Sequence, residues 1–331
     1  MKSSYRITGL IAILSIALCS FRPGLADDRF VLHYDHPIAE NLKRLDHSVP
    51  RSQVNNRFMT QALPLGNGRF GAMFSGHVDS EYLVFNDITL WMNSTRGESE
   101  FKQSGSRADG RDYLEVVRAA CREGKYGAKA GSAEALGTKY LASKQRLGNF
   151  APFADLEIRT GHDPSAAKDY RRALDISAGV GSVRYTVGDV KYSREYFCSH
   201  PHDVFVARFT ADGGTMDLVL EARTAHPRRT IQSKGREIHL RGSASMTRDD
   251  MAFMQAVRVV AGDAKVEAEA NGTLHIRGAS EVILYVAGYT DYLPRYPDFK
   301  GRDYKGDTFR ALQQAEKLGY TTLKRSHVSD V

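Results

Sequence analysis

Hydrophobic and polar residues alternate along much of the second half of the chain. Val183, Tyr185 and Val187 alternate with polar neighbours, and the alternation resumes at Val190 after Gly188-Asp189. A period of two is typical of a β-strand with one buried face, and Gly-Asp is a turn-forming pair. This segment therefore predicts a β-hairpin that turns one face toward a hydrophobic core.

Short apolar runs of the same kind recur at regular spacing, separated by turns such as Asp212-Gly213-Gly214. Many short strands at such spacing are typical of a β-sandwich. The predicted fold is therefore all-β with minor α, a large antiparallel β-(super)sandwich. Its expected strands cover residues 29–34, 70–75, 82–85, 156–160, 182–187, 190–197, 204–210, 215–222, 237–240, 252–260, 265–268, 274–277 and 282–287.

Two segments change to a helical period. Residues 112–126 carry apolar side chains on one helical face, and residues 127–145 favour a second, weaker helix. Near the C-terminus, residues 308–328 carry an apolar residue about every third position, with Gly319 as an expected interruption. The sandwich is therefore expected to carry a short helical insertion and a C-terminal linker helix.

The N-terminus has the organisation of a signal peptide. Lys2 and Arg6 precede an apolar run over residues 7–18, and small residues surround a cleavage site after Ala26. We therefore predict that residues 1–26 are removed and that the protein is secreted or periplasmic.

The net charge and its distribution limit the classes of partner that this chain is expected to bind. The net charge is +7, and residues 1–26 hold three basic residues and no acid, which leaves +4 on the mature chain. No basic block is interleaved with aromatic residues, so a nucleic-acid partner is not expected. The mature chain has no apolar stretch long enough for a membrane span, and we expect no cofactor.

Cysteine usage leaves two questions open. Cys19 would allow a lipid anchor, although Leu18 stands where such a signal prefers a small residue. Cys121 and Cys198 could pair in an oxidising compartment, or both could be free thiols.

Three segments stand out from the general strand pattern. Residues 63–73 read LPLGNGRFGAM, and three glycines within six residues indicate a tightly turning backbone. Residues 85–91 read FNDITLW and hold the only tryptophan. Residues 170–176 read YRRALDI and lead into VRYTVGDVKYSREYF at 183–197.

In this order and spacing, the segments resemble the N-terminal domain of glycoside hydrolase family 95, best known for α-L-fucosidases. Typical family sequences read LPLGNGRLGAM, LNEDTLW, YQPLGDL and YRRELDL, and the third corresponds to FAPFADL at residues 150–156. The resemblance covers about residues 30–330. The sequence departs from the family at Asp87, where glutamate is usual, and at Ala154, where glycine is usual.

After the signal peptide over 1–26, the resemblance implies an N-terminal β-sandwich domain over 27–303 and a helical linker over 304–331. The linker would lead toward an (α/α)6 barrel, in cis or on a separate chain. In enzymes of this kind the barrel carries the acid and the water-positioning groups of inverting hydrolysis. No catalytic residue is therefore carried over onto this chain, which we expect to be inactive alone and to meet glycan substrate only through the full-length enzyme.

Five polar or aromatic residues of the matching segments are candidates for the rim of a substrate pocket. The polar ones could bond sugar hydroxyls, and the tryptophan could offer an apolar platform. Alternatively, they form turns and caps, with the tryptophan as a core or interdomain anchor. The candidates are Asn67, Arg69, Asn86, Asp87 and Trp91.

Other chemistry-bearing residues favour structural interpretations. Asp155 and Glu157, two residues apart on a predicted strand, and Glu195 are interpreted as solvated or salt-bridged surface groups. His200-x-His202 has no evident third ligand, so no metal site is predicted.

Two other functions remain open at this point. The chain could be a stand-alone secreted carbohydrate-binding module without hydrolase activity, with Tyr289, Tyr292 and Tyr296 on its surface rather than in its core. It could also be a purely structural scaffold.

Overall fold

The computed structural model describes most of the chain after the N-terminal segment. The predicted signal peptide and its cleavage site lie outside the described residues. These residues are 30–39, 57–92, 110–127, 129–141, 149–244, 251–296 and 298–331.

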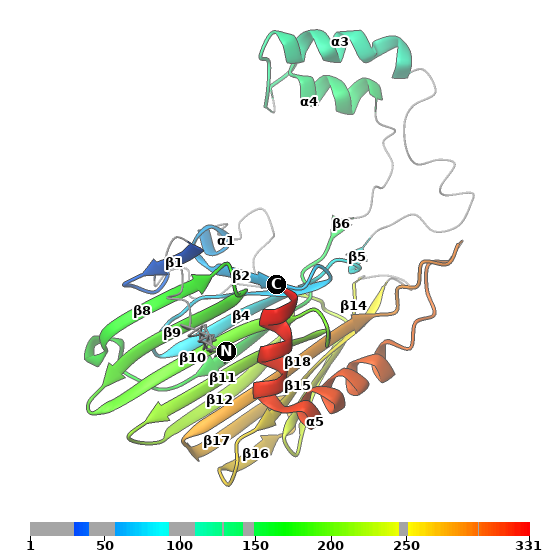
Figure 1. The fold of residues 1–331 in the computed structure, drawn as a ribbon. Helices are drawn as coiled ribbons and strands as arrows, with labels where there is room; N and C mark the ends of the chain where they lie inside the picture. Colours follow the sequence, from blue (N-terminus) through cyan, green and yellow to red (C-terminus); the bar gives the residue numbers. More distant parts are fainter. Residues whose placement is uncertain are drawn as a thin grey trace, which may run out of the picture.

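Two antiparallel sheets form the body of the molecule (Figure 1). The nine-stranded sheet has the order β1-β8-β9-β10-β11-β18-β15-β14-β13, and the seven-stranded sheet has the order β16-β17-β12-β7-β4-β3-β2. The first comprises β1 (Val31–Tyr34), β8 (Lys168–Asp175), β9 (Val180–Val187), β10 (Val190–Ser199), β11 (Val204–Asp212), β18 (Glu281–Thr290), β15 (Ala252–Val260), β14 (Glu237–Ser243) and β13 (Arg229–Lys234). The second comprises β16 (Lys265–Glu269), β17 (Thr273–Ala279), β12 (Met216–Arg223), β7 (Ala154–Arg159), β4 (Ser80–Asp87), β3 (Phe70–Phe74) and β2 (Leu63–Gly66).

The hydrophobic core lies between the two sheets because alternate residues of their strands point inward. Leu83 and Phe85 of β4 face Phe205 of β11, and the rings of Phe85 and Phe205 meet edge to face at 5.2 Å. These observations confirm the predicted sandwich with minor helical structure.

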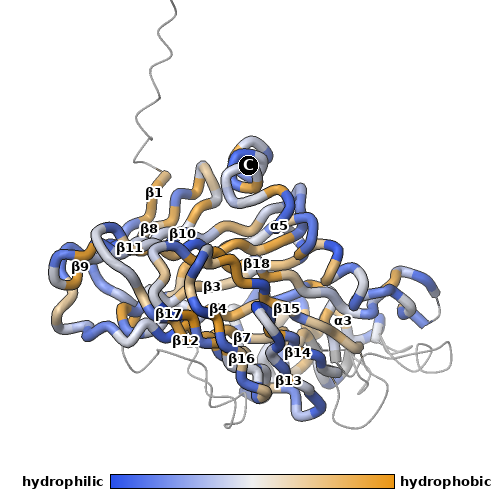
Figure 2. The backbone as a smooth tube through the Cα atoms, turned by 90° about the horizontal axis from the view of Figure 1, so that it is seen from below, coloured by the Kyte–Doolittle hydropathy of each residue, from blue (hydrophilic) through white to orange (hydrophobic). Residues whose placement is uncertain are grey.

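The C-terminal helix α5 (Tyr304–Asp330) covers part of the outer face of the nine-stranded sheet, as Figure 2 shows from another side. Leu312, Ala315 and Leu323 pack there against outward-facing residues of β11, β15 and β18. Gly319 has a φ of 73°, which breaks the helix into two parts as the sequence predicted. The sheet is therefore buried on both faces where α5 crosses it.

His327 connects the second part of α5 to the sheet. Its ring stacks on Phe197 at 5.0 Å, and its Nε2 lies 3.0 Å from the carbonyl oxygen of Gly179. Burial lowers the pKa of His327 below its ordinary value. The unfolded chain therefore binds a proton more readily than the folded chain.

We expect the free energy of unfolding to fall as the pH drops below about 6.5, the unfolded value, and to stop falling below the folded pKa. Urea unfolding of the wild type and of His327→Gln between pH 8 and 5 would measure this. The variant lacks this titration, so its stability should fall less over the same interval. Parallel curves would contradict the prediction.

Several smaller elements lie outside the two sheets. The strands β5 (Trp91–Met92) and β6 (Asn149–Phe150) form a two-stranded pair. The helices α3 (Gly110–Arg122) and α4 (Ala133–Leu136), the latter continued by a π-helical turn (Gly137–Leu141), form a hairpin that stands apart from the sandwich in Figure 1. Helix α1 (Arg57–Gln61) brings Phe58 onto the outer face of the seven-stranded sheet, and a 3-10 turn covers Pro164–Ala166.

In the described part of the chain, no helix combines the length and apolarity needed to cross a bilayer.

Five strands were not predicted from the pattern, namely the short pair β5 and β6 and three strands of the two large sheets. β2 contains Pro64 and Gly66, which weaken a strand signal, and it is tolerated because it lies at a sheet edge. β8 is rich in charged residues and β13 in polar ones, and much of each strand is exposed. An amphipathic period is weak where few side chains are buried.

Candidate functional site

The glycine-rich segment forms the β2–β3 hairpin, and Asn67 holds its turn. The side-chain oxygen of Asn67 accepts hydrogen bonds from the backbone N–H groups of Arg69 at 3.1 Å and Phe70 at 2.8 Å. Gly68 has a φ of 90°, which glycine adopts without strain. The Asn67 amide nitrogen donates to Asp203 at 2.9 Å and to the carbonyl of Ser199 at 3.2 Å. Asn67 therefore shapes the turn and ties it to the loop between β10 and β11.

Arg69 lies at the centre of a network of charges. Its Nε and Nη2 donate to Asp203 at 2.9 and 2.8 Å, and its Nη1 donates to Asp87 and to the carbonyl of Gly288. Its guanidinium carbon lies 4.1 Å from the ring centre of Tyr289, whose hydroxyl donates to Asp203 at 2.8 Å. The donors of Arg69 are thus directed at groups of the protein itself.

The pKa values of the two carboxylates in this network shift in opposite directions. Burial raises the pKa of Asp87, and Arg69 and Thr89 offset this only in part. Burial also acts to raise the pKa of Asp203, but the hydrogen bonds and charge of Arg69 outweigh it and hold the pKa below the ordinary value. Asp87 also accepts hydrogen bonds from the backbone N–H of Thr89 at 2.8 Å and from its hydroxyl at 2.6 Å. One guanidinium thus bridges two carboxylates inside the domain.

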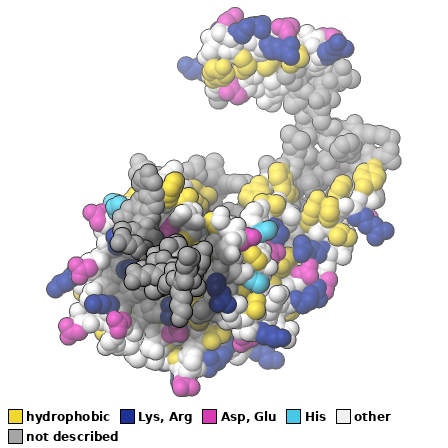
Figure 3. All heavy atoms as spheres, in the orientation of Figure 1, with side chains coloured by type: hydrophobic (Ala, Val, Ile, Leu, Met, Phe, Trp, Pro, Cys, Tyr) yellow, Lys and Arg dark blue, Asp and Glu magenta, His cyan; other side chains and the backbone are white. Residues whose placement is uncertain are grey.

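Trp91 lies at the molecular surface, at the same end of β4 as this network. Its side chain is 43% exposed, its Nε1 donates to the carbonyl of Ile88 at 2.9 Å, and its ring meets Phe150 edge to face at 6.0 Å. Ile88 beside it is 57% exposed, and Figure 3 shows hydrophobic side chains gathered around β5 and β6. Trp91 is therefore not a core residue and presents apolar surface to solvent.

The structure brings together three of the five predicted rim residues. Asn67, Arg69 and Asp87 share one network, and Trp91 is exposed near it. Asn86 is half-buried on the opposite face of β4 from Asp87, because neighbouring residues of a strand point to opposite sides.

Asp203 was not among the predicted site residues, and Tyr289 was named only as a surface residue of the binding-module alternative. Tyr289 alternates with inward-facing residues of β18 and is 6% exposed, whereas Tyr296 is 62% exposed. The period of β18 could have placed Tyr289 on the face under α5. No pattern in the neighbouring sequence singles out Asp203, because it contacts Arg69 from a loop that is distant along the chain.

A second cluster of charges joins the two sheets. Arg194 of β10 donates to Glu81 of β4 at 3.2 Å, and both side chains are almost fully buried. Arg194 also donates to the carbonyls of His77 and Val78 at 2.6 and 2.8 Å. Glu81 accepts hydrogen bonds from Tyr196 at 2.7 Å and from Ser75 at 2.8 Å. Every one of these partners belongs to the sandwich.

The other carboxylates also have partners. Asp155 is 1% exposed and accepts a hydrogen bond from Tyr82 at 2.6 Å, so its expected place at the surface was wrong. Tyr82 reaches it because the paired strands β4 and β7 bring the two side chains to the same face. Glu157 pairs with Arg223 at 2.9 Å, and Glu195 pairs with Lys324 at 2.7 Å, as expected of salt-bridged groups.

His200 and His202 both contact residues of α5, and neither Cys121 nor Cys198 forms a disulfide. His200 contacts Asp330 at 3.1 Å, and His202 contacts Ser326 at 3.2 Å. No group of three or more metal-ligating side chains is found among the residues that the structure describes. Cys121 is an exposed free thiol, and Cys198 is a buried one whose Sγ donates to the carbonyl of Phe70.

Comparison with known proteins assigns the chain to a family. Residues 33–295 match the family described as "Glycosyl hydrolase family 65, N-terminal domain". The chain is 28% identical over 283 residues to "Probable alpha-fucosidase A" of Aspergillus niger, covering 82% of this chain and 35% of that protein. It is 31% identical over 190 residues to "Alpha-L-fucosidase 2" of Arabidopsis thaliana, covering 57% of this chain and 21% of that protein.

A solved structure titled "Putative kojibiose phosphorylase from human microbiome" aligns with a TM-score of 0.48 at 12% identity, covering 91% of this chain and 37% of that one. The chain thus spans about a third or less of the length of these curated relatives. The resemblance to an N-terminal glycoside hydrolase domain is confirmed, and the chain belongs to the family of glycosyl hydrolase family 65 N-terminal domains.

Proposed function

We propose that this chain is the non-catalytic N-terminal domain of an exported α-L-fucosidase-type glycoside hydrolase, which cleaves O-glycosidic bonds in fucosylated glycans. The chemistry would belong to an (α/α)6 barrel, in cis or on a separate chain. The sandwich would supply a rigid support for that barrel.

The observation that carries this proposal is the match over residues 33–295 together with relatives named as fucosidases. The described carboxylates support it as well. Glu81, Asp87 and Asp155 are buried and engaged by Arg194, Arg69 and Tyr82. Inverting hydrolysis instead needs two carboxyl groups that flank a substrate and leave room for a water molecule.

The proposal is tested by assaying residues 27–331 on nitrophenyl α-L-fucoside and on a 2′-fucosylated oligosaccharide. The assay is run with and without an added barrel domain from a related fucosidase. We expect no turnover by the chain alone and turnover above that of the barrel alone when the two are combined. Turnover by the chain alone would contradict the non-catalytic role.

A second candidate function is direct glycan contact by Trp91, in the full-length enzyme or in a stand-alone binding module. The observation that favours it is the exposed apolar surface of Trp91 and Ile88. Aromatic side chains with such surfaces suit the apolar faces of sugar rings.

For this function, Trp91→Ala should weaken binding of fucosylated oligosaccharides by about tenfold. Stability should change by less than about 0.5 kcal/mol, because the side chain is exposed. Titration calorimetry measures the first effect and urea unfolding the second. Tyr126→Ala, which removes an exposed aromatic residue from the helical hairpin, is the control. Equal affinities of wild type and Trp91→Ala would exclude the tryptophan as a platform.

A further inference from the structure

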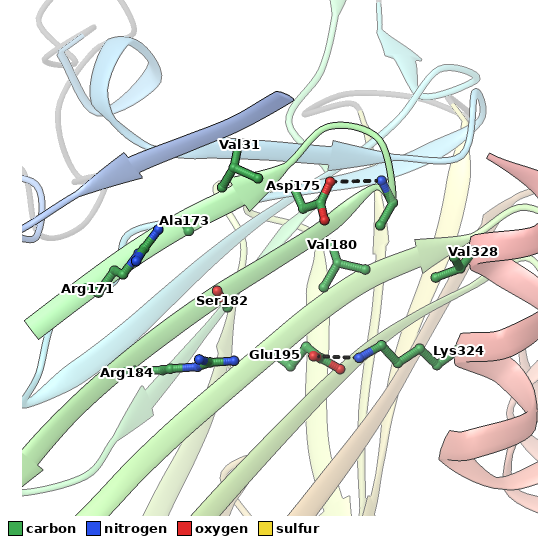
Figure 4. Close-up of a pocket in the computed structure, with 11 residues that line it drawn as sticks. Val31, Arg171, Ala173, Asp175, Val180, Ser182, Arg184, Glu195, Lys324 and Val328 are labelled. Carbon is green, nitrogen blue, oxygen red and sulfur yellow. Dashed lines mark hydrogen bonds and ion pairs between the residues drawn. The ribbon is translucent and has the colours of Figure 1, made fainter. Parts of the chain in front are cut away.

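A groove lies on the part of the nine-stranded sheet that α5 leaves open (Figure 4). Its floor is the outer face of β8, β9 and β10, with β1 on one side and the last turns of α5 on the other. The volume is about 350 Å³, which lies in the range of ligand sites. Its principal lining residues are Val31, Arg171, Val180, Arg184, Lys324 and Val328.

Two arginines stand directly opposite each other in this groove. Arg171 of β8 and Arg184 of β9 are partners in the strand register, and both side chains are exposed. Directly opposite residues bring their Cβ atoms to within about 5.5 Å, and like charges in such a pair destabilise a sheet. In the described part of the chain, neither guanidinium forms an ion pair. The two like charges therefore repel each other across the strand pair. Replacement of either arginine by a neutral residue would remove this repulsion.

The two acids of the groove contact groups other than the two arginines. Glu195 pairs with Lys324 at 2.7 Å. Asp175 accepts hydrogen bonds from the hydroxyl of Ser177 at 2.6 Å and from the backbone N–H of Ala178 at 3.1 Å, so it closes the turn after β8. The lining therefore holds three basic groups (Arg171, Arg184 and Lys324) and two acidic ones, which leaves a net charge of +1 with neither arginine paired to an acid among the described residues.

We propose that this groove binds a sugar that carries an oxyanion, a carboxylate or a sulfate, between Arg171 and Arg184. Guanidinium groups donate paired hydrogen bonds to such oxyanions, and a bound anion removes the repulsion between the two arginines. Ala173 and Ser182, directly opposite each other on the same strands, leave room for a sugar ring. Val180 and Val328 supply apolar surface beside it. The sugar part of this inference rests on the proposed function, and it extends the ligands to acidic glycans.

The experiment measures binding to the purified chain by titration calorimetry and by thermal shift at constant ionic strength. The probes are glucuronate for a carboxylate, galactose 6-sulfate for a sulfate, galactose as the neutral sugar, and inorganic sulfate. The variants are Arg171→Gln and Arg184→Gln, with Arg295→Gln as an exposed arginine control from the loop after β18.

We expect at least one acidic sugar to bind more tightly than galactose and than inorganic sulfate. The relative strength of glucuronate and galactose 6-sulfate tells which oxyanion the site prefers. Each groove variant should weaken this binding about tenfold, whereas Arg295→Gln should leave it unchanged. Equal binding by wild type and groove variants, or inorganic sulfate binding as tightly as both acidic sugars, would overturn the proposal.

A charge reversal gives a readout that loss of folding cannot mimic. Arg184→Glu places an acid opposite Arg171, so the melting temperature without ligand should rise by about 1–2 °C while binding of the acidic sugar is lost. A reversed variant that still binds would contradict the proposal. Both measurements are independent of fucoside turnover, so failure of the groove proposal and failure of the fucosidase proposal are distinguishable.

Discussion

Replacement of Arg194 by alanine should lower the free energy of unfolding by about 3–5 kcal/mol. The side chain is 2% exposed and bonds Glu81 as well as the carbonyls of His77 and Val78. Its removal leaves the Glu81 carboxylate buried without a cation and removes the donor of two carbonyl groups. An uncompensated buried charge costs far more than the pair gains.

Urea unfolding of wild type and Arg194→Ala at neutral pH measures this difference. Arg208→Ala is the matched control, because Arg208 lies on the neighbouring strand β11 and forms an exposed ion pair with Glu281. An exposed pair contributes about 1 kcal/mol or less. Equal losses in the two variants would show that the buried pair does not hold the sheets together. A double replacement, Arg194→Met with Glu81→Leu, should recover part of the loss because it leaves no unpaired charge.

Arg69→Ala should lower the free energy of unfolding by about 2–3 kcal/mol. This is less than for Arg194, because the Arg69 side chain is 18% exposed and solvent screens part of the interaction. Asp87, fully buried, loses its cation, and Asp203 loses the donors that hold its pKa down. The loop between β10 and β11 then also loses its main tie to the β2–β3 hairpin.

Asn86→Ala is the control for this second prediction. Asn86 is adjacent to Asp87 but half-buried on the opposite face, so its loss should change stability by less than about 0.5 kcal/mol. If Arg69→Ala has an equally small effect, the network is not structural, and a role of Arg69 at a pocket rim gains support. A large effect identifies the network as part of the framework of the domain.

The strand pattern could be predicted because each strand carries its own period. Val183, Tyr185 and Val187 alternate over a few residues, and a local window is enough to detect this. The same holds for the apolar face of α5 and for the break at Gly319. These features depend on neighbours in sequence, which any single sequence contains.

The partners of the buried charges could not be predicted in this way. Arg194 meets Glu81 across 113 residues, and Arg69 meets Asp203 across 134 residues and Gly288 across 219. Only the pairing of distant strands brings them together. The strand period alone does show that Arg194 and Glu195 face opposite sides, and the structure places Arg194 in the core and Glu195 against α5.

The four edge strands have a further consequence for the behaviour of the protein in solution. Open sheet edges can recruit strands from other molecules and so start aggregation. Here β2 carries Pro64 at its edge, β1 has only four residues, and β13 begins and ends with a basic residue. The fourth edge, β16, alternates Lys265, Glu267 and Glu269 on its exposed side. We expect these features to disfavour edge-to-edge association of the two wide sheets.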